Sequence, residues 1–367
     1  MVTMKSAVLT GPGPLSIEEV TLDGPEAGEV LVKITACGVC HSDLHVINGV
    51  RAAGKTATPI ILGHEAAGIV EEIGANVRSV KPGDHVIMAF HPTCGTCYYC
   101  RRAMPQICET PDFPDRSVDG RRPRLKINGE VPARQGIGVG GFSEFTCMPE
   151  GGVIRIRNDA PLETVCLVGC GVTTGIGAVT NAARVEAGSM VAVIGLGGVG
   201  LNCIQGARLA GAHRIFAIDT LADKLEMAAQ FGATDFINAS QEEDVVARVI
   251  EMTDGRLDYA FEAIGLGKTV EQAFGMIRPG GTAVVVGVTA DNVTVPGRAF
   301  LAEKKLIGSL YGSASIHYMI PRLVDLYMEG KVQLDELVSK RRPLAEINEA
   351  FADLAAGHVA RSVMNIA

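Results

Sequence analysis

The distribution of apolar residues divides the chain into two regions with different patterns. Up to residue 171, apolar runs are short and are separated by turns rich in Gly and Pro, which is typical of a β-rich region with many loops. The strands expected there include residues 31–34, 67–70 and 85–88. Beyond about residue 190, apolar strands alternate with helical patterns. That alternation predicts an α/β domain with a parallel, doubly wound sheet.

Individual elements can be predicted in the second region. The expected strands are residues 191–194, 214–218, 257–263 and 283–288, and the expected helices are residues 198–210 and 222–231. The alternation breaks near Tyr311-Gly312, and one more helix is expected at 319–327. We therefore expect a β-rich domain at 1–171, a doubly wound domain at 172–310 and a C-terminal part, 311–367, that returns to the first domain.

Composition and charge narrow the class of protein. The 367 residues are 47% hydrophobic and 20% charged, which suits a globular chain of two domains. A formal net charge of -8 argues against nucleic acid as the main partner. The N-terminus shows no apolar leader and no run of about 18 apolar residues occurs, so we expect a cytoplasmic protein without a membrane span. In that compartment, 10 cysteines indicate metal or redox chemistry rather than disulfides.

Four neighbouring cysteines predict a closed metal site. Cys94, Cys97 and Cys100 are separated by two residues each, and Cys108 follows shortly after. Four thiolates complete a tetrahedron and leave no open position, so a structural zinc is expected in a lobe at about residues 92–110. A disulfide pair and an iron–sulfur cluster are the alternatives for this spacing.

A second set of residues predicts a catalytic zinc. Cys40, His64 and the distant Cys170 are the expected ligands, and a three-ligand set leaves one position for water or substrate. Asp43 is expected to accept the other ring N–H of His64. Taken singly, a histidine such as His64 is more often a satisfied polar group than a metal ligand, and Cys170 would pass as a core cysteine. The residues expected to relay a proton from a bound alcohol to solvent are Ser42 and His45.

A glycine-rich turn between a strand and a helix predicts a dinucleotide site. Asp219 ends the next strand, where its carboxylate can accept hydrogen bonds from a ribose. Its charge would repel a 2′-phosphate, so NAD is expected rather than NADP. The alternative role for Asp219 is a helix N-cap. The turn places backbone amides and a helix N-terminus against the pyrophosphate, and its glycines are Gly195, Gly197, Gly198 and Gly200.

With these motifs in place, the chain resembles the zinc-dependent alcohol dehydrogenases of the medium-chain dehydrogenase/reductase superfamily. The resemblance covers essentially the whole chain, from the Gly63-His64-Glu65 motif to residues 360–362. The length of the segment between Cys108 and Gly141 resembles the longer branch, which includes horse-liver-like and glutathione-dependent formaldehyde dehydrogenases. The family implies a GroES-like catalytic domain, a Rossmann domain inserted into it and an active site between them.

Matching positions imply further roles. Cys40, His64 and Cys170 match the catalytic-zinc ligands, and Glu65 matches a carboxylate near the metal. Phe90 matches a wall of the substrate pocket, to which Ser42 also belongs. The residues assigned to the cofactor by this resemblance are His41, Thr174, Val199, Asp219, Lys224, Val288 and Arg361.

The expected function is the reversible oxidation of primary or secondary alcohols to aldehydes or ketones, with NAD and two zinc ions per chain, one catalytic and one structural. Apolar alcohols, including aromatic or allylic ones, are the expected substrates. S-(hydroxymethyl)glutathione is the alternative substrate. It is disfavoured because Arg51 stands where glutathione-dependent members carry an acid, and Asp112 where they carry an arginine.

Two further alternatives remain at this point, a zinc-free reductase of the same superfamily and a zinc-stabilised nucleotide-binding regulatory protein. The open three-ligand set argues against both. The expected partners are a small-molecule alcohol or aldehyde and a second copy of the chain in a homodimer, with a homotetramer as the alternative. Residues 284–288 are the expected strand at the oligomer edge.

Overall fold

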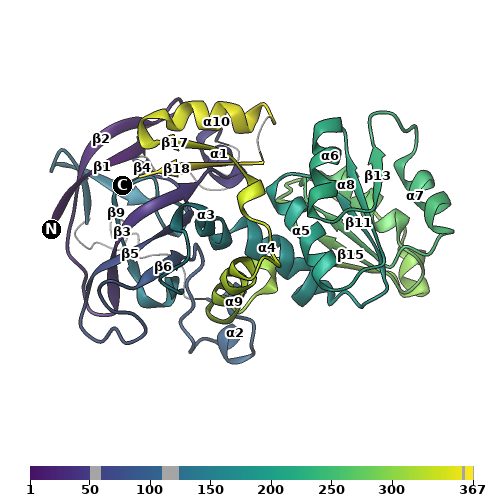
Figure 1. Ribbon diagram of the computed structural model, residues 1–367, viewed down its shortest axis with the longest axis horizontal. Coiled ribbons are helices and arrows are strands. Elements are labelled where there is room, and N and C mark those ends of the chain that lie inside the picture. The colour runs from purple at the N-terminus through teal and green to yellow at the C-terminus, as the bar shows by residue number, and fades with distance from the viewer. Residues whose placement is uncertain (50–58, 110–123, 358–359, 367) are drawn as a thin grey trace. The chain divides into compact units, whose positions relative to one another are not determined.

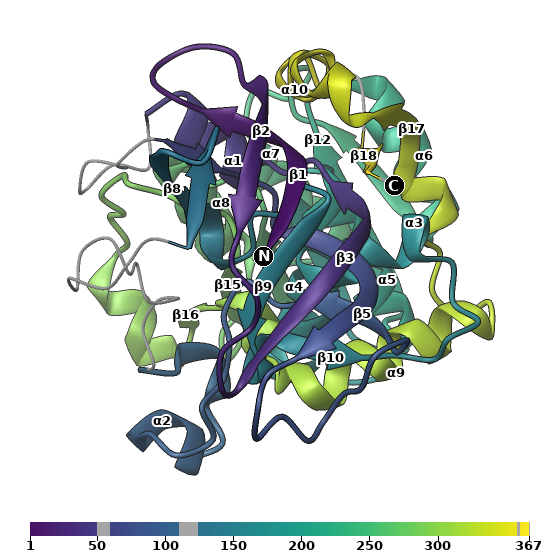
Figure 2. The same cartoon turned by 90° about the vertical axis from the view of Figure 1, so that its left-hand side faces the viewer.

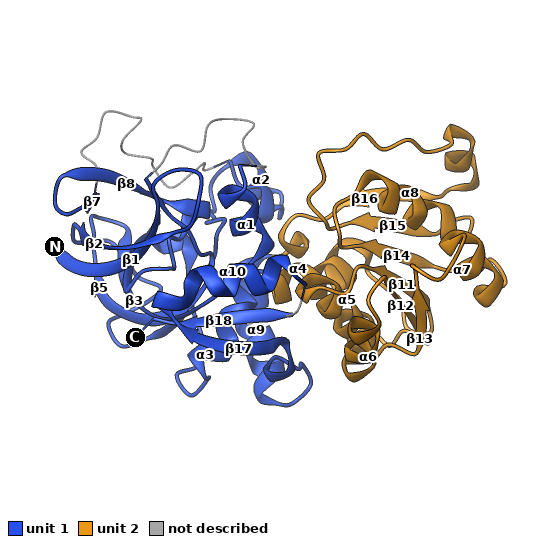
Figure 3. Cartoon of the chain, turned by 90° about the horizontal axis from the view of Figure 1, so that it is seen from above, with its two compact units in different colours: residues 1–170, 315–367 blue, residues 171–314 orange. Residues whose placement is uncertain are grey.

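A computed structural model describes residues 1–49, 59–109, 124–357 and 360–366 and divides the chain into two compact units (Figure 3). Unit 1 consists of residues 1–170 and 315–367, and unit 2 consists of residues 171–314. The chain therefore leaves unit 1 after Cys170 and returns to it at Ser315. The expected boundaries, at residues 171 and 310, lie close to these positions.

Unit 1 is built from a small closed barrel and a seven-stranded sheet. The strands of the barrel, in spatial order, are β1 (Val2–Leu9), β2 (Ser16–Leu22), β7 (Leu125–Ile127), β8 (Val131–Gln135) and β4 (Ile60–Ile61). The order in the sheet is β10 (Val153–Arg155), β6 (His85–Met88), β5 (Glu65–Ile73), β3 (Glu29–Gly38), β18 (Arg361–Asn365) and β17 (Val338–Pro343), and β9 (Phe145–Pro149) also pairs with β3. Figure 2 shows β3 and β5 side by side.

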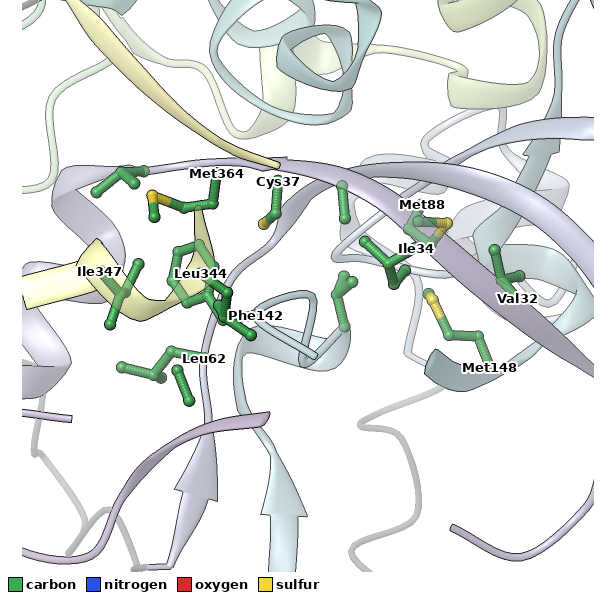
Figure 4. Packing of buried hydrophobic residues seen from close by; sticks show 14 of the residues in the cluster. Val32, Ile34, Cys37, Leu62, Met88, Phe142, Met148, Leu344, Ile347 and Met364 are labelled. Carbon is green, nitrogen blue, oxygen red and sulfur yellow. The ribbon is translucent and has the colours of Figure 1, made fainter. Parts of the chain in front are cut away.

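The C-terminal segment helps to form the core of unit 1. Strand β18 pairs with β3, so the end of the chain lies inside the sheet rather than on its surface. Leu344 and Ile347 pack with Leu62 and Phe142 in one buried cluster (Figure 4). The helices of this unit are α1 (His41–Ile47), α2 (Tyr98–Arg101), α3 (Leu162–Val165), α9 (Ile316–Met328) and α10 (Ile347–Ala355).

Unit 2 is a six-stranded parallel sheet with helices between successive strands (Figure 1). The inner strands are buried along their length, as expected of a parallel sheet that is covered on both faces. The strand order is β13 (Asp235–Asn238), β12 (Arg214–Asp219), β11 (Met190–Ile194), β14 (Tyr259–Glu262), β15 (Thr282–Val285) and β16 (Lys305–Gly308). The helices are α4 (Gly171–Gly177), α5 (Gly198–Leu209), α6 (Ala222–Phe231), α7 (Val245–Thr253) and α8 (Gly267–Met276).

The prediction of a strand at 283–288 is wrong in two respects: the strand ends earlier, and it does not lie at the edge of the sheet. Strand β15 stops at Val285, because the N–H groups of Val286 and Gly287 both turn to the carbonyl of Glu262. It also lies between β14 and β16, so it cannot be an oligomer edge. The edge on this side is β16, which apolar periodicity did not predict because the strand is only four residues long.

No single helix among the described residues is long and apolar enough to cross a membrane. The bent pair of helices Leu162–Gly169 and Gly171–Ala183 meets these criteria of length and composition when the two are taken together, although neither helix meets them alone.

Candidate zinc and dinucleotide sites

Unit 1 brings Cys40, His64, Glu65 and Cys170 together, with one ligand atom of each within 4.8 Å of the others. Cys40 is the N-cap residue of α1, and His64 directly precedes β5. Cys170 follows the 3-10 turn Cys166–Gly169. All four are buried. Three segments that are far apart in sequence therefore form one ligand set of the soft, nitrogen- and sulfur-rich kind that zinc favours.

Asp43 holds the imidazole of His64 in one orientation. Its Oδ2 lies 2.9 Å from His64 Nδ1, and its Oδ1 accepts the backbone N–H of Gly63 at 3.0 Å. Both side chains are buried. With Nδ1 committed to the carboxylate, Nε2 is the ring atom available to a metal, which is the usual arrangement around a ligating histidine. Gly63 has φ +92, and a Cβ there would meet Phe142 N at 2.7 Å, so this approach requires glycine.

The electrostatics of the cluster favour a cation. A hydrogen bond from the Cys170 thiol holds the pKa of Cys40 well below its usual range, although burial opposes the shift. The same contact, together with burial, raises the pKa of Cys170. Burial lowers the pKa of His64, but Asp43 and Cys40 outweigh burial, and the net pKa lies well above the usual range. Surroundings that stabilise positive charge on a buried imidazole stabilise a metal cation for the same reason.

Glu65 and Arg361 form a buried ion pair beside these ligands. Arg361 Nε lies 3.3 Å from Glu65 Oε2, and Nη2 lies 3.4 Å from Oε1. Burial lowers the pKa of Arg361, but Glu65 and the two cysteines outweigh it and raise that pKa above the usual range. Arg361 was assigned to the cofactor, whereas the structure places its guanidinium against the carboxylate of the metal cluster.

The residues assigned to proton relay lie on α1, and Phe90, assigned to the substrate pocket, follows β6. Ser42 and His45 are three positions apart on α1, so they share one face of the helix, and both are partly buried. His41, the first residue of this helix, is exposed. Phe90 presents its ring edge-on to His64, with 5.6 Å between ring centroids and an interplanar angle of 85°. An aromatic wall therefore stands directly beside a proposed metal ligand.

The four-cysteine lobe forms a second cluster in which the sulfurs lie within 4.8 Å of one another. Backbone N–H groups point at these sulfurs, including those of Cys97 to Cys94 Sγ at 3.2 Å and of Cys100 to Cys97 Sγ at 3.4 Å. The sulfurs of Cys97 and Cys108 are 3.8 Å apart. A disulfide is about 2.05 Å long. A zinc tetrahedron with Zn–S of about 2.3 Å has edges of about 3.8 Å, so the residues fit a closed zinc site.

The glycine turn of unit 2 has the geometry of a phosphate cradle. Gly195 has φ +90, and a Cβ there would lie 2.4 Å from Ile264 Cγ1. A Cβ on Gly200 would lie 1.8 Å from the carbonyl oxygen of Gly195, so the helix packs directly on the turn. At Gly197 the space is open, with no atom within 4 Å of an added Cβ. The turn is closed on the protein side and open at its middle glycine, where a pyrophosphate would approach.

The carboxylate of Asp219 holds the glycine turn and the segment that follows β12. Its Oδ2 accepts the N–H of Leu196 at 2.8 Å, and its Oδ1 accepts the N–H of Thr220 at 2.8 Å and that of Leu221 at 3.1 Å. Lys224 Nζ lies 3.8 Å from Oδ2. The alternative role as a helix N-cap does not hold, because the N-cap of α6 is Leu221.

The remaining residues assigned to the cofactor belong to unit 2. Thr174 on α4, Val199 on α5 and Val288 after β15 belong to unit 2, and Val288 is exposed. Arg51 and Asp112, on which the case against a glutathione adduct depended, lie outside the described residues. Glu262 was missed. The signal available in the sequence was an acid at the end of a strand, directly before Ala-Ile-Gly.

Two family models match the chain, the alcohol dehydrogenase GroES-like domain over residues 26–158 and the zinc-binding dehydrogenase over residues 198–329. The NDMA-dependent alcohol dehydrogenase of Amycolatopsis methanolica is 42% identical, over 98% of each chain.

The chain belongs to the zinc-dependent alcohol dehydrogenases of the medium-chain dehydrogenase/reductase superfamily.

Further relatives of this family agree with the fold and with the chemistry. The S-(hydroxymethyl)glutathione dehydrogenase of Photobacterium damsela subsp. piscicida is 41% identical over 98% of this chain and 99% of the relative. Other relatives, at 38% to 41% identity, carry the same name or that of class-3 alcohol dehydrogenase. The solved benzyl alcohol dehydrogenase of Acinetobacter calcoaceticus superposes with a TM-score of 0.93 at 31% identity, covering all of both chains. This chain is accordingly an NAD-dependent zinc alcohol dehydrogenase with a GroES-like and a Rossmann domain.

Proposed function

We propose that this alcohol dehydrogenase oxidises S-(hydroxymethyl)glutathione with NAD. The observation that carries the proposal is the group of relatives that match over the full length of the chain and bear that name or the class-3 name. Apolar alcohols were expected from the sequence on the basis of Arg51, Asp112 and Phe90, and the first two of these residues lie outside the described part of the chain. The comparisons therefore favour the adduct over the substrate class expected first.

The residues divide the work of the reaction. Cys40, His64 and Cys170 would hold the catalytic zinc, and Asp43 keeps the His64 ring in the tautomer that could bind it. The zinc held there would supply Lewis-acid chemistry that makes the substrate hydroxyl a stronger acid, and NAD would supply the hydride acceptor. Ser42 and His45 carry the hydroxyl proton to solvent. The substrate thus loses one hydride and one proton. Its hydroxymethyl carbon stays bound to sulfur and becomes the carbonyl carbon of a thioester.

Apolar alcohols are the second candidate class. The edge-on contact of Phe90 with His64 places an apolar wall beside the proposed metal site, and the benzyl alcohol dehydrogenase shares the whole fold. An aromatic ring packs well on such a wall, with offset or edge-to-face contacts worth about 0.5–1.5 kcal/mol beyond burial.

Catalytic efficiency decides between the two classes. We expect kcat/KM on formaldehyde plus glutathione to exceed that on benzyl alcohol or hexanol by about tenfold or more, a difference of about 1.4 kcal/mol in transition-state binding. The variant Phe90→Ala should lower kcat/KM on benzyl alcohol more than on the adduct. Higher efficiency on benzyl alcohol than on the adduct would reject the proposal and select the second class.

We also propose that the chain forms a homodimer through strand β16, with a homotetramer as the alternative. This strand lies at one edge of the unit 2 sheet, and exposed edges tend to pair with another chain. Apolar side chains flank it, with Leu301 87% exposed and Leu310 50% exposed. Light scattering should give a dimer for the parent and a monomer for Leu301→Glu. A monomeric parent would reject this assembly.

A further inference from the structure

Glu262 is a fully buried carboxylate at the carboxyl end of β14. Its strand lies next to β11, which leads into the glycine turn, and the order of strands reverses between these two. Ligands of open α/β sheets bind at such a reversal, just beyond the carboxyl ends of the strands. The carboxylate therefore lies beneath the expected dinucleotide site, and none of the roles assigned above uses it.

One oxygen of this carboxylate gathers three donors from the loop that follows β14. Glu262 Oε1 accepts the N–H of Ile264 at 2.9 Å, the N–H of Gly265 at 2.7 Å and the hydroxyl of Thr269 at 2.8 Å. Thr269 lies in the first turn of α8, so the loop is tied to the start of its helix. Hydrogen bonds to a charged group are about twice as strong as neutral ones, so this carboxylate fixes the path of residues 263–269.

The backbone of the same residue fixes the neighbouring loop. The Glu262 carbonyl accepts the N–H of Val286 at 2.9 Å and that of Gly287 at 3.0 Å. Gly287 also approaches the side chain, because a Cβ there would lie 2.8 Å from Glu262 Oε2 and 2.2 Å from Gly265 N. The loops after β14 and β15 are thus held against each other around one side chain.

These loops bear directly on the glycine turn. The N–H of Ala263 donates to the carbonyl of Ile194 at 2.9 Å, and a Cβ on Gly195 would lie 2.4 Å from Ile264 Cγ1. On the other side, a Cβ on Gly265 would lie 2.4 Å from the carbonyl oxygen of Val288. A shift of the loop at 263–265 would therefore move the wall of the cradle in which the pyrophosphate is expected.

We propose that Glu262 is a positioning residue for NAD, which sets cofactor affinity by ordering the loops at 263–265 and 286–288 without contributing to hydride or proton transfer. A carboxylate is a costly residue at a fully buried strand end, where an apolar side chain would satisfy packing alone. The two backbone N–H groups account for its presence, because Glu262 Oε1 is the acceptor of both, whereas the Thr269 hydroxyl also lies 2.8 Å from the carbonyl of Leu266.

The binding of NADH to the zinc-loaded, full-length protein, followed by fluorescence, tests the proposal in the absence of any alcohol. Glu262→Ala should raise the Kd for NADH by about tenfold or more, because it removes charge-assisted hydrogen bonds that order the loop. Glu262→Gln should stay within about threefold of the parent, since its amide oxygen can accept the same three donors. Hydrogen exchange at Ile264 and Gly265 should accelerate in the alanine variant only.

Steady-state kinetics separate positioning from catalysis. In Glu262→Ala we expect KM for NAD to rise with the Kd while kcat at saturating NAD stays within about threefold. Glu271→Gln is the control, because this acid lies on α8, the helix of Thr269, and accepts the N–H of Thr294 rather than one from the loop at 263–265. If the alanine variant does not fold, Thr269→Val removes one donor and should raise the Kd about threefold.

A glycine pair provides an independent arm. Gly287→Ala should weaken NADH binding because its Cβ collides with Gly265 N, whereas Gly297→Ala, with no atom within 4 Å of the added carbon, should not. A folded Glu262→Ala protein that binds NADH within twofold of the parent would overturn the proposal, as would equal losses in the alanine and glutamine variants. Because no alcohol is present, either outcome is independent of which substrate the enzyme takes.

Discussion

Replacing Asp43 with asparagine tests whether the catalytic zinc depends on the orientation of His64. In the parent, Asp43 Oδ2 lies 2.9 Å from His64 Nδ1 and Oδ1 accepts the N–H of Gly63 at 3.0 Å, in a fully buried position. Asparagine keeps the shape but offers only one oxygen. Its NH₂ group must then face either the Gly63 N–H or the imidazole.

The structure determines the consequence for the imidazole. If the amide oxygen keeps the Gly63 N–H, the NH₂ group donates to His64 Nδ1, and the ring proton moves to Nε2, the atom that would bind zinc. The metal must then compete with that proton or break the new hydrogen bond. Loss of such a partner costs about 10- to 100-fold in metal affinity, which corresponds to about 1.4–2.7 kcal/mol.

Zinc content after dialysis against a chelator measures the effect. The parent should retain two zinc ions per chain, and Asp43→Asn should retain one, the zinc of the four-cysteine lobe. Asp84→Asn is the control, since Asp84 is also buried and accepts a backbone N–H, from Lys81 at 3.0 Å, but in a turn that holds no metal ligand. An Asp43→Asn protein that resists the chelator as well as the parent does would refute the reasoning.

Three further predictions concern the lobe, the cofactor and acid stability. Cys97→Ser should lower the melting temperature and remove one zinc. Cys40→Ser should abolish turnover with little change in the melting temperature, and full activity in Cys40→Ser would reject the catalytic assignment. Asp219→Gly should raise the Kd for NAD about tenfold or more and reduce the preference for NAD over NADP, measured as the ratio of kcat/KM with NAD to kcat/KM with NADP. Burial raises the pKa of Asp235, but its hydrogen bonds with Arg214 and Thr234 outweigh burial and lower it. The contribution of Asp235 to folding stability is therefore complete above the unfolded pKa, about 3.9, and is lost as pH falls through the lower folded pKa. Denaturant titrations should show that Asp235→Asn destabilises the protein near pH 7 but not in strong acid.

The parts of the fold that local pattern dictates were predictable from sequence. The buried run at 191–194 became β11, and the helical pattern at 222–231 became α6 with the same bounds. Periodicity works there because each element buries one continuous set of side chains against the sheet. It fails for β13 and β16, which are four residues long and keep part of their side chains exposed, so neither has enough alternation to stand out.

The contacts that complete the candidate sites lie beyond the reach of any local pattern. The carboxylate of Glu65 meets Arg361 at the far end of the chain, because β18 returns to pair with β3. Glu262 lies opposite Ile194, the residue before the glycine turn, because β14 pairs with β11 where the strand order reverses. Both pairings depend on topology, and a single sequence without a fold does not specify which strand ends become neighbours.

The turn at Tyr311-Gly312-Ser313 shows tertiary packing overriding local preference. All three residues have positive φ, at 52, 67 and 48, although only the middle one is glycine. A left-handed backbone costs a residue with a side chain about 1–2 kcal/mol, so Tyr311 and Ser313 together cost about 2–4 kcal/mol. Burying the ring of Tyr311, which is 1% exposed, offsets about 1.5–3 kcal/mol of that cost. A Cβ on Gly312 would lie 2.2 Å from the carbonyl oxygen of Thr173, so the turn seats directly on α4, the helix that begins one residue after Cys170. The strain is tolerated because the buried ring of Tyr311 and the close packing of Gly312 on α4 hold the turn in this conformation.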